Sequence, residues 1–563
     1  MMAHLASALL AVCTALAVPV LADSLADVEH VILFMQENRA FDHYFGSMAG
    51  VRGFSDPNVQ VNAGGKEVWF QDVNTQLTNA TDFLAPWYLN YLGGFWLNAT
   101  QCMDAGDNGW SSNHAAINGD LNNHWATNNT PWSWGHYVRS DLPVQYALAD
   151  GWTVGDMYQT TPEFYQEAGV PWQIYQDTDN FDDNPLAWFK QYQEAAPGTP
   201  LFDRGMAILG LDTFYAQAKN GTLPAVSLII GPTQLSEHPP FSPHDGAWLQ
   251  KQVVDAVTTG AAYSKSVLMI SYDESGGWGD HVTPFHSPNG TAEEWIEDPF
   301  GNVGFTYAGP GIRLPFYIIS PWTRGGKVFV EHADHNSQIM FVEEWQAAKG
   351  KNVKSDQVAS WRREHMSDLL NAFDFGHPDL SLPVLPNAPA PHVNAMGQFD
   401  GSSFCESQFP VQRPPPPFGK QSTTVSALSE KGFKGVRGAL TEGRFLTFES
   451  NGFALQSPGF GLPECIAGRA TATHAFIKQH WVLHQTVSGG LTFKISNAAD
   501  GLYLGPLLFM VKDVGLAETF TITYVGAGQY TLQQSDGKYV GLEILGIVAL
   551  TGQKTAFSVF SVT

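Results

Sequence analysis

Four short apolar segments restrict the fold of this chain more than any other feature of its sequence. None of them alternates apolar with polar residues, which is typical of strands that are covered on both faces. We therefore predict a doubly wound α/β sheet, in which ligands bind at the carboxyl ends of the strands. The segments are HVILFM (30–35), AVSLII (225–230), SVLMISY (266–272) and PFYIIS (315–320).

The length and the charge of the chain limit its organisation and its partners. A chain of 563 residues is too long for one hydrophobic core, so two domains are expected. The net charge of −25 argues against nucleic acid as a partner, because an acidic surface repels phosphate backbones. The same charge opposes binding to acidic membranes, but it leaves peripheral contact with neutral or zwitterionic lipid surfaces open. No coiled-coil seam for self-association is evident.

The amino-terminal segment predicts secretion. Residues 1–22 contain the apolar stretch LASALLAVCTALAVPVLA, which ends in small residues as a cleavable signal peptide does. An uncleaved membrane anchor is the alternative, because no Lys or Arg precedes the apolar stretch. Five Asn-x-Ser/Thr sequons further along indicate a glycosylated extracellular protein. The sequons begin at Asn79, Asn98, Asn128, Asn220 and Asn289.

A proline-rich segment divides the mature chain. FPVQRPPPPFGK (409–420) cannot form a helix or a central strand and is typical of a stiff linker. We therefore place a catalytic domain at residues 23–405, a linker at 406–420 and a β-rich module at 421–563. Three stretches of the module combine alternating apolar residues with a polar turn, which predicts hairpins and a β-trefoil-like fold, with a β-sandwich as the alternative. The stretches are 444–455, 491–505 and 529–541.

Polar residues follow two of the apolar segments directly. Glu37 and Asn38 come after the first, and Asp273 and Glu274 come after the third. Taken singly, an acidic residue after a strand is more often a helix cap. Carboxylates that converge at one sheet edge repel each other unless a cation neutralises them, and oxygen donors suit a divalent ion such as Ca, Mg, Mn or Zn. The two clusters together therefore predict a metal site.

Histidines recur beside small polar residues and prolines, and two arginines accompany them. Each histidine alone is more often an ordinary hydrogen-bonded residue, but imidazoles oriented by carboxylates also serve phosphate binding, metal ligation or proton transfer. Arg39 and Arg313 are candidate phosphate partners, and a structural ion pair is the alternative for each. The histidines are His114, His238, His281 and His335.

Several blocks of the sequence resemble one known family. MQENRAFDHYFGSMAGVRGF, SEHPP, DESGGWGDHV and RLPFYIISPWTRGGKVFVEHADHNS are similar to signature blocks of the phosphoesterase family, and they run in family order across residues 28–350. That family holds the non-specific phospholipases C and some acid phosphatases, within the alkaline phosphatase superfamily. The resemblance implies an α/β/α sandwich and phosphate-ester hydrolysis. It implies metal ligation by Glu37, Asn38, Asp273 and Glu274, and phosphate contact or leaving-group assistance by the four histidines.

The nucleophile that the resemblance implies is not found in the sequence. Family members carry a Thr or Ser in a block resembling Thr-Asn-Pro-Asn-Arg, after a strand equivalent to DGWTVGDMYQ (150–159). Here Gln159 leads directly into a stretch that resembles a segment well downstream, so several tens of residues are absent. Thr160 and Thr161 are weak substitutes, because Thr160 and Glu163 have the spacing of a capping box that opens a short helix ending at Gly169.

The cysteine count points in the same direction. The mature chain contains Cys102, Cys405 and Cys465, an odd number, so a lost segment could have held the partner of Cys102. Either a coding segment is missing from this form of the chain, or a true variant has kept the metal site and lost catalysis. The retention of the metal-binding and histidine blocks favours the first explanation.

The sequence as a whole predicts a secreted, metal-dependent phosphoesterase that resembles phospholipase C and acts on phospholipids or other phosphate esters. An acid-phosphatase-type phosphomonoesterase is the alternative within the enzyme class. A non-catalytic phosphate- or sugar-binding protein is the alternative outside it, because the aromatic-rich stretch 109–137 could recognise a ligand without hydrolysis.

Overall fold

The computed structural model describes residues 24–159, 170–459, 463–542 and 547–563. The predicted signal peptide lies outside the described residues. Thr160, Thr161 and the short helix predicted after them lie outside the described residues as well.

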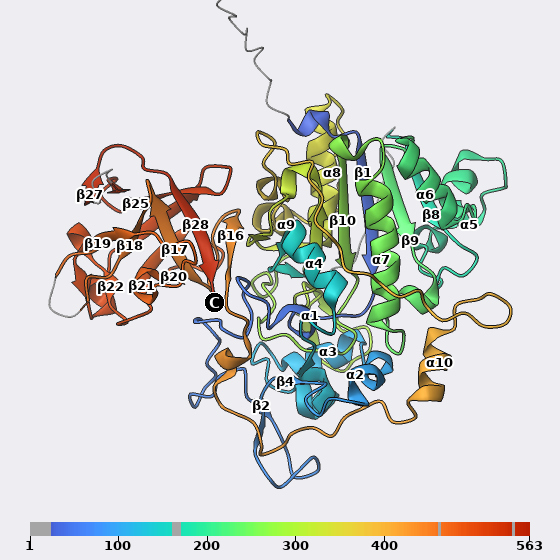
Figure 1. The fold of residues 1–563 in the computed structure, drawn as a ribbon, viewed down its shortest axis with the longest axis horizontal. Helices are drawn as coiled ribbons and strands as arrows, with labels where there is room; N and C mark the ends of the chain where they lie inside the picture. The colour runs from blue at the N-terminus through green and yellow to red at the C-terminus, as the bar shows by residue number, and fades with distance from the viewer. Residues whose placement is uncertain (1–23, 160–169, 460–462, 543–546) are drawn as a thin grey trace, which may run out of the picture.

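All four apolar segments form strands of one large sheet (Figure 1). They are β1 (His30–Gln36), β9 (Val226–Ile230), β10 (Ser266–Tyr272) and β13 (Phe316–Ile319). β8 (Trp172–Gln176), β9, β1 and β10 lie side by side and run parallel. β13 runs antiparallel to β10, so the sheet is mixed rather than wholly parallel.

The other half of the sheet brings together strands that are far apart in the sequence. β13 pairs with β6 (Thr153–Gly155), and β6 pairs in parallel with β14 (Lys327–Phe329). β14 pairs in turn with β16 (Phe433–Arg437), which lies beyond the proline-rich segment. The start of the carboxyl-terminal region is therefore hydrogen-bonded into the sheet of the predicted catalytic domain.

Helices cover both faces of the sheet, which gives a mixed α/β fold. α4 (Pro143–Gly151), α6 (Leu211–Asn220) and α7 (Pro243–Thr258) lie on one face, and α8 (His335–Ala348) lies on the other. Local sequence fixes where these helices begin. The hydroxyl of Ser242 accepts a hydrogen bond from the backbone N–H of His244 at the start of α7, where Pro243 occupies the first turn.

Shorter elements surround this sheet. The helices are α1 (Phe41–Phe45), α2 (Trp96–Ala99), α3 (Trp110–Ile117), α5 (Lys190–Gln193), α9 (Ser360–His365) and α10 (Gly401–Gln408). The strand pairs are β2 (Gln71–Asp72) with β3 (Phe83–Leu84), β4 (Trp87–Tyr88) with β5 (Gly135–His136), β7 (Tyr158–Gln159) with β15 (Ala333–Asp334), and β11 (Trp295–Glu297) with β12 (Phe305–Tyr307).

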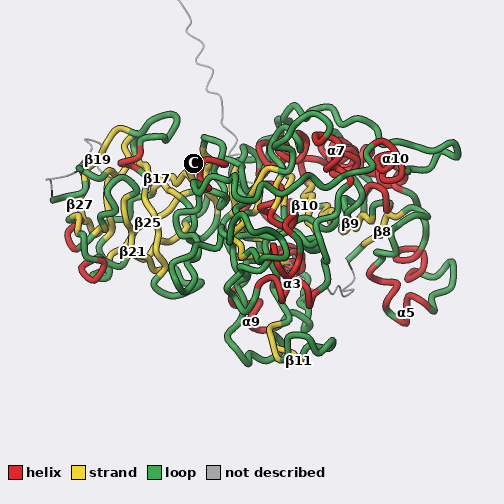
Figure 2. The backbone as a smooth tube through the Cα atoms, turned by 90° about the horizontal axis from the view of Figure 1, so that it is seen from below, coloured by secondary structure: helices red, strands yellow, loops and turns green. Residues whose placement is uncertain are grey.

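The regular elements of the carboxyl-terminal region are mostly strands, joined by loops, as Figure 2 shows. Each of the three predicted hairpin stretches contains a pair of antiparallel strands, so the hairpin prediction is confirmed. The strands are β17 (Phe445–Ser450), β18 (Phe453–Gln456), β19 (Ile466–Arg469), β20 (Trp481–Gln485), β21 (Thr492–Asn497), β22 (Tyr503–Leu504), β23 (Met510–Val511), β24 (Phe520–Tyr524), β25 (Gln529–Gln534), β26 (Tyr539–Leu542), β27 (Val548–Thr551) and β28 (Phe557–Val562).

The cysteine pairing differs from the prediction. Cys102 forms a disulfide with Cys405 in α10, and of the cysteines that the structure describes Cys465 is the one left free, buried in the carboxyl-terminal region. The inference that a lost segment held the partner of Cys102 was therefore wrong. Parity cannot show which of three cysteines lacks a partner, and the residue left over is the one enclosed in a β-sheet core.

The proline-rich segment packs against the first domain. The indole N–H of Trp132 donates a hydrogen bond to the carbonyl of Pro414 at 2.7 Å, and the hydroxyl of Tyr91 donates to the carbonyl of Pro415 at 3.0 Å. Within the described ranges, each helix is too short or too polar to cross a lipid bilayer.

Candidate metal-binding and phosphoesterase site

The first and third apolar segments deliver their polar residues to the same point. β1 and β10 are parallel neighbours with Gln36 opposite Tyr272, so the chain leaves both strands side by side. The backbone N–H of Asn38 donates to Oδ1 of Asp273 at 2.7 Å, and its amide Nδ2 donates to Oδ2 of Asp273 at 3.2 Å. The predicted convergence of the two strand ends therefore occurs.

Two side chains that the sequence analysis did not single out join this cluster. Nδ2 of Asn108 donates to Oδ1 of Asn38 at 2.8 Å and to Oε1 of Glu274 at 3.1 Å. The carboxyl group of Asp183 interacts with that of Glu37. Both residues lie on loops without a periodic pattern, and the acid-rich DNFDDNP stretch around Asp183 was the available signal. Glu37, Asp183 and Asp273 line one pocket.

The electrostatics of this cluster fit a bound cation. Burial raises the pKa of Glu37, and the neighbouring carboxyl groups of Asp183 and Asp273 raise it further. Burial also raises the pKa of Asp273 and of Glu274, and the charge of Asp273 adds to the shift at Glu274. Carboxylates in this situation either take up protons or share a metal ion. Carboxylate and amide oxygens are suitable ligands for a hard divalent cation.

The backbone around the cluster is tightly constrained. Asn38 has a left-handed φ of 64°, which turns the chain sharply after β1. Gly276 has a φ of 66°, and a Cβ atom there would lie 2.0 Å from the carbonyl oxygen of Asn38. Glycine is required at this position because any side chain would collide with the turn that holds Asn38.

A second acidic group lies nearby in the sequence, formed by Asp42, Asp280 and His281. Their ligand atoms all lie within 4.8 Å of one another, so this group could hold a metal ion. Arg313 already donates to both carboxylates, at 2.8 Å to Asp280 and 3.0 Å to Asp42. The two ring nitrogens of His281 lie 2.5 Å from Asp42 and 3.2 Å from Asp56. The observed arrangement is a buried ion-pair network whose carboxylates are neutralised by side chains.

Two of the four predicted histidines, His335 and His238, interact with a residue of the carboxylate cluster or with its neighbour in the chain. Nε2 of His335 lies 3.0 Å from the carbonyl oxygen of Tyr272, the residue before Asp273. Burial lowers the pKa of His238, and the charge of Asp183 opposes that shift. Nδ1 of His238 lies 2.6 Å from the carbonyl oxygen of Pro239, which orients the ring.

The other two histidines have different surroundings. His114 packs against Trp110 and Tyr307, with ring centroids 4.3 Å and 4.9 Å away, and burial lowers its pKa to about 4. Burial disfavours the charged form of His281, but the carboxylate of Asp42 outweighs burial and raises the pKa of His281. His281 therefore belongs to the ion-pair network described above.

The guanidinium of Arg39 is buried and is engaged by the backbone. Its Nε donates to the carbonyl of Glu237 at 2.9 Å, and its Nη2 donates to the carbonyls of Glu237 and Phe241. These bonds hold the loop that carries His238, so Arg39 positions that histidine in the observed geometry.

Comparison with known proteins identifies the family. The model of the Phosphoesterase family matches residues 28–163 and 157–346, which is more than half of the chain. This chain therefore belongs to the phosphoesterase family, as the signature blocks predicted.

Several relatives are bacterial phospholipases C. The chain is 33% identical over 440 residues to the non-hemolytic phospholipase C of Burkholderia pseudomallei, which covers 65% of this chain and 61% of the relative. It is 32% identical over 457 residues to the non-hemolytic phospholipase C of Pseudomonas aeruginosa, covering 70% and 63% of the two chains. Phospholipase C B of Mycobacterium tuberculosis is 30% identical over 444 residues, covering 66% and 82%. The chain thus spans less than two thirds of the first two relatives.

Proposed function

We propose that this protein is a secreted, metal-dependent phosphoesterase of the phospholipase C type, which cleaves glycerophospholipids to diacylglycerol and a phosphorylated headgroup. The observation that carries the proposal is the cluster of buried carboxyl and amide groups at the ends of β1 and β10. The names of the relatives support the substrate class. The Cys102–Cys405 disulfide supports secretion, because disulfides persist in oxidising compartments.

In this proposal Glu37, Asn38, Asp273 and Glu274 hold the divalent ion, and Asp183 faces the same pocket. A bound divalent ion supplies charge neutralisation for the phosphate group and the developing negative charge. Asn108 orients two ligands, because its amide donates to Asn38 and to Glu274.

We assign His238 and His335 to phosphate contact or to protonation of the leaving oxygen. The carbonyl oxygen of Pro239 orients the ring of His238 and that of Tyr272 orients the ring of His335, and imidazoles held in this way can contact phosphate or transfer a proton. Arg39 acts indirectly by fixing the loop that carries His238. His281 receives no such role, because its ring contacts the carboxylates of Asp42 and Asp56. His114 receives none either, because its ring packs against Trp110 and Tyr307.

The attacking hydroxyl belongs, in our proposal, to a segment that this chain lacks between Gln159 and Thr160. One comparison supports a loss at this point, because the two matches to the family model meet at residues 157–163. A second supports a loss from the chain as a whole: the alignment to the Burkholderia relative extends over 440 residues but takes up only 65% of this chain's 563, so several tens of its positions face gaps in this chain.

The test is a hydrolysis assay of two proteins made in parallel: this chain, and the chain encoded by full-length transcripts across the Gln159–Thr160 junction. Each is given phosphatidylcholine vesicles and p-nitrophenyl phosphate, with divalent metal and with EDTA. We expect metal-dependent hydrolysis of the phospholipid by the longer chain and none by this one. A preference for the small monoester would overturn the phospholipase assignment in favour of a phosphomonoesterase.

A non-catalytic phosphate- or sugar-binding protein is the second candidate, and the direct Gln159–Thr160 junction favours it. If every transcript contains that junction, hydrolysis by this chain is compared with that of the double variant Thr160→Ala, Thr161→Ala. Equal hydrolysis by both proteins would exclude these two hydroxyls as nucleophiles.

We also propose a β-trefoil-like fold for the carboxyl-terminal region. The three hairpins, at roughly regular intervals along residues 444–541, support a threefold repeat. A sugar-binding role for this region can be tested with a glycan array.

A further inference from the structure

The carboxyl group of Glu237 receives hydrogen bonds from four side chains that come from four different elements. The amides of Gln36 in β1 and Gln250 in α7 donate to its Oε1, at 3.4 Å and 2.7 Å. The hydroxyl groups of Tyr44 in α1 and Tyr272 in β10 donate to its Oε2, and the bond from Tyr272 measures 2.9 Å. All five side chains are buried. This one carboxyl group therefore connects β1, β10, α1 and α7.

The backbone around Glu237 is shaped to hold its side chain in this place. Glu237 has a left-handed φ of 73°, which is uncommon for a residue other than glycine and is typical of functional sites. The helix α7 approaches closely at Gly246, where a Cβ atom would lie 2.1 Å from Cγ of Glu237. Glycine is therefore required at this point of the helix, because a side chain would occupy the space of the carboxyl group.

Three members of this network directly precede a residue that we assign to the candidate site. The backbone N–H of Glu37 donates to the carbonyl of Ser236 at 2.9 Å, and that of Asp273 donates to the carbonyl of Gln36 at 3.0 Å. The three chain segments are thus bonded to one another as well as to the buried carboxyl group. The consecutive pairs are Gln36 and Glu37, Glu237 and His238, and Tyr272 and Asp273.

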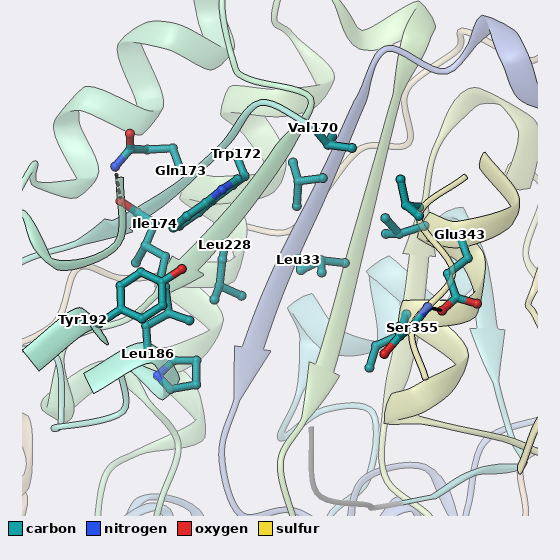
Figure 3. A pocket seen from close by; sticks show the side chains of 15 residues that line it. Leu33, Val170, Trp172, Gln173, Ile174, Leu186, Tyr192, Leu228, Glu343 and Ser355 are labelled. Carbon is teal, nitrogen blue, oxygen red and sulfur yellow. Dashed lines mark hydrogen bonds between the residues drawn. The ribbon is translucent and has the colours of Figure 1, made fainter. Parts of the chain in front are cut away.

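A second buried carboxyl group, that of Glu343 in α8, has a different arrangement. It accepts hydrogen bonds from the backbone N–H of Ser355 at 2.7 Å and from Arg363 at 2.6 Å. It lines an apolar hollow with Leu33, where Figure 3 shows its contact with Ser355. Its two partners belong to the segment that follows α8, which carries no predicted site residue. Glu343 therefore offers a matched comparison for Glu237.

We propose that Glu237 is a positioning residue of the candidate site. Its carboxyl group holds the ends of β1 and β10 in the arrangement that lets Glu37 and Asp273 share one divalent ion, and it fixes the loop that carries His238. The inference rests on the metal site of the proposed function. It extends that proposal from the groups that touch metal or substrate to a group beneath them that acts through its neighbours.

Two hydroxyl deletions test the proposal without opening a large cavity. Tyr272→Phe and Tyr44→Phe each remove one hydrogen bond to Glu237. We expect each to weaken calorimetric binding of Mg²⁺, Ca²⁺, Mn²⁺ or Zn²⁺, whichever binds the wild type, by about tenfold, as is typical when a group that supports metal ligands is lost. Tyr530→Phe is the matched control and should bind as the wild type, because its buried hydroxyl donates to the carbonyl of Gly438 in the carboxyl-terminal region.

Variants of the carboxyl group itself give a second comparison. Glu237→Ala should weaken metal binding more than either tyrosine variant. Glu237→Gln should restore it, because an amide can accept a hydrogen bond from Gln250 and donate to the tyrosine hydroxyls. Glu343→Ala is the control and should bind metal as the wild type, although it also removes a buried carboxyl group.

Hydrogen exchange followed by mass spectrometry measures the positioning role in the metal-free protein. In Tyr44→Phe, the peptides that contain Glu37, His238 and Asp273 should all exchange faster, whereas Tyr530→Phe should leave them unchanged. Unchanged exchange in these peptides, or metal affinity as in the wild type for both Tyr272→Phe and Tyr44→Phe, would overturn the proposal. A wild type that binds no metal, with all three peptides responding, would count against the proposed function only. Metal binding by the wild type with unresponsive peptides would count against the positioning role only.

Discussion

Arg444 in the carboxyl-terminal region forms a buried, two-pronged ion pair with Asp156 in the first domain. Its Nη2 and Nε lie 2.6 Å and 2.9 Å from the two carboxylate oxygens, and both side chains are almost wholly buried. The backbone N–H of Arg52 donates to the same carboxylate. Together with the pairing of β14 and β16, this contact joins the two regions into one structural unit.

Substitution of Arg444 by Met should therefore destabilise the whole protein. It leaves the buried carboxylate of Asp156 without its main cation, which typically costs about 3–5 kcal/mol. Urea denaturation followed by tryptophan fluorescence measures the change. Lys538→Met is the control, because Lys538 and Asp536 form an exposed pair that contributes little to stability. Two separate unfolding transitions would contradict the account if the substitution shifted only the transition of the carboxyl-terminal region.

Glu237 should make stability depend on pH. Burial raises the pKa of Glu237 to about 7, even though Tyr272 and Gln250 donate to its carboxylate at 2.9 Å and 2.7 Å. Between the ordinary value of 4.5 and about 7, the unfolded chain has lost this proton while the native state keeps it. The stability that protonation of Glu237 contributes to the native state is thus complete below pH 4.5. The free energy of unfolding falls by roughly 3 kcal/mol as pH rises through 7.

The variant Glu237→Gln isolates this effect. The difference in free energy of unfolding between Glu237→Gln and the wild type should shift in favour of the variant between pH 4.5 and pH 8. Chemical denaturation at the two pH values measures it, and other titrating groups cancel in the comparison. An identical difference at both pH values would show that Glu237 does not titrate in this range.

The disulfide closes a long loop, because Cys102 and Cys405 are 303 positions apart in the sequence. The double variant Cys102→Ser, Cys405→Ser should lose about 2–5 kcal/mol of stability, because the unfolded chain gains conformational freedom. Thiol labelling of the unfolded mature chain without reductant should modify Cys465 alone. Labelling of all three cysteines would refute the pairing.

The parts of this structure that sequence could predict are those fixed by local pattern. The four apolar segments became strands, and Glu37 and Asp273 met because parallel neighbours end at one edge. Asp183 and Asn108 were missed because loop residues meet through long-range folding that no periodicity records. The pairing of β16 with β14 of the first domain was missed for the same reason, because the proline-rich segment suggested that two separate domains meet there.

Removal of a repelled charge from the carboxylate cluster should have opposite effects with and without metal. In EDTA, Glu274→Gln should raise the melting temperature, because burial and Asp273 disfavour the ionised carboxyl of Glu274 in the native state, whereas an amide carries no charge. With divalent metal the wild type should gain stability and the variant should gain less. Glu297→Gln, on the exposed end of β11, is the control and should behave as the wild type. Equal stabilisation by metal in all three proteins would contradict the assignment of Glu274 as a ligand.

The central claim is that the metal lies between the ends of β1 and β10 rather than in the ion-pair network of Asp42, Asp280 and His281. Calorimetric titration of Mg²⁺, Ca²⁺, Mn²⁺ and Zn²⁺ into the metal-free wild type, Glu37→Gln and His281→Gln tests it most directly. We predict binding to the wild type and to His281→Gln, and its loss in Glu37→Gln. Retained binding in Glu37→Gln together with its loss in a folded His281→Gln would contradict the account.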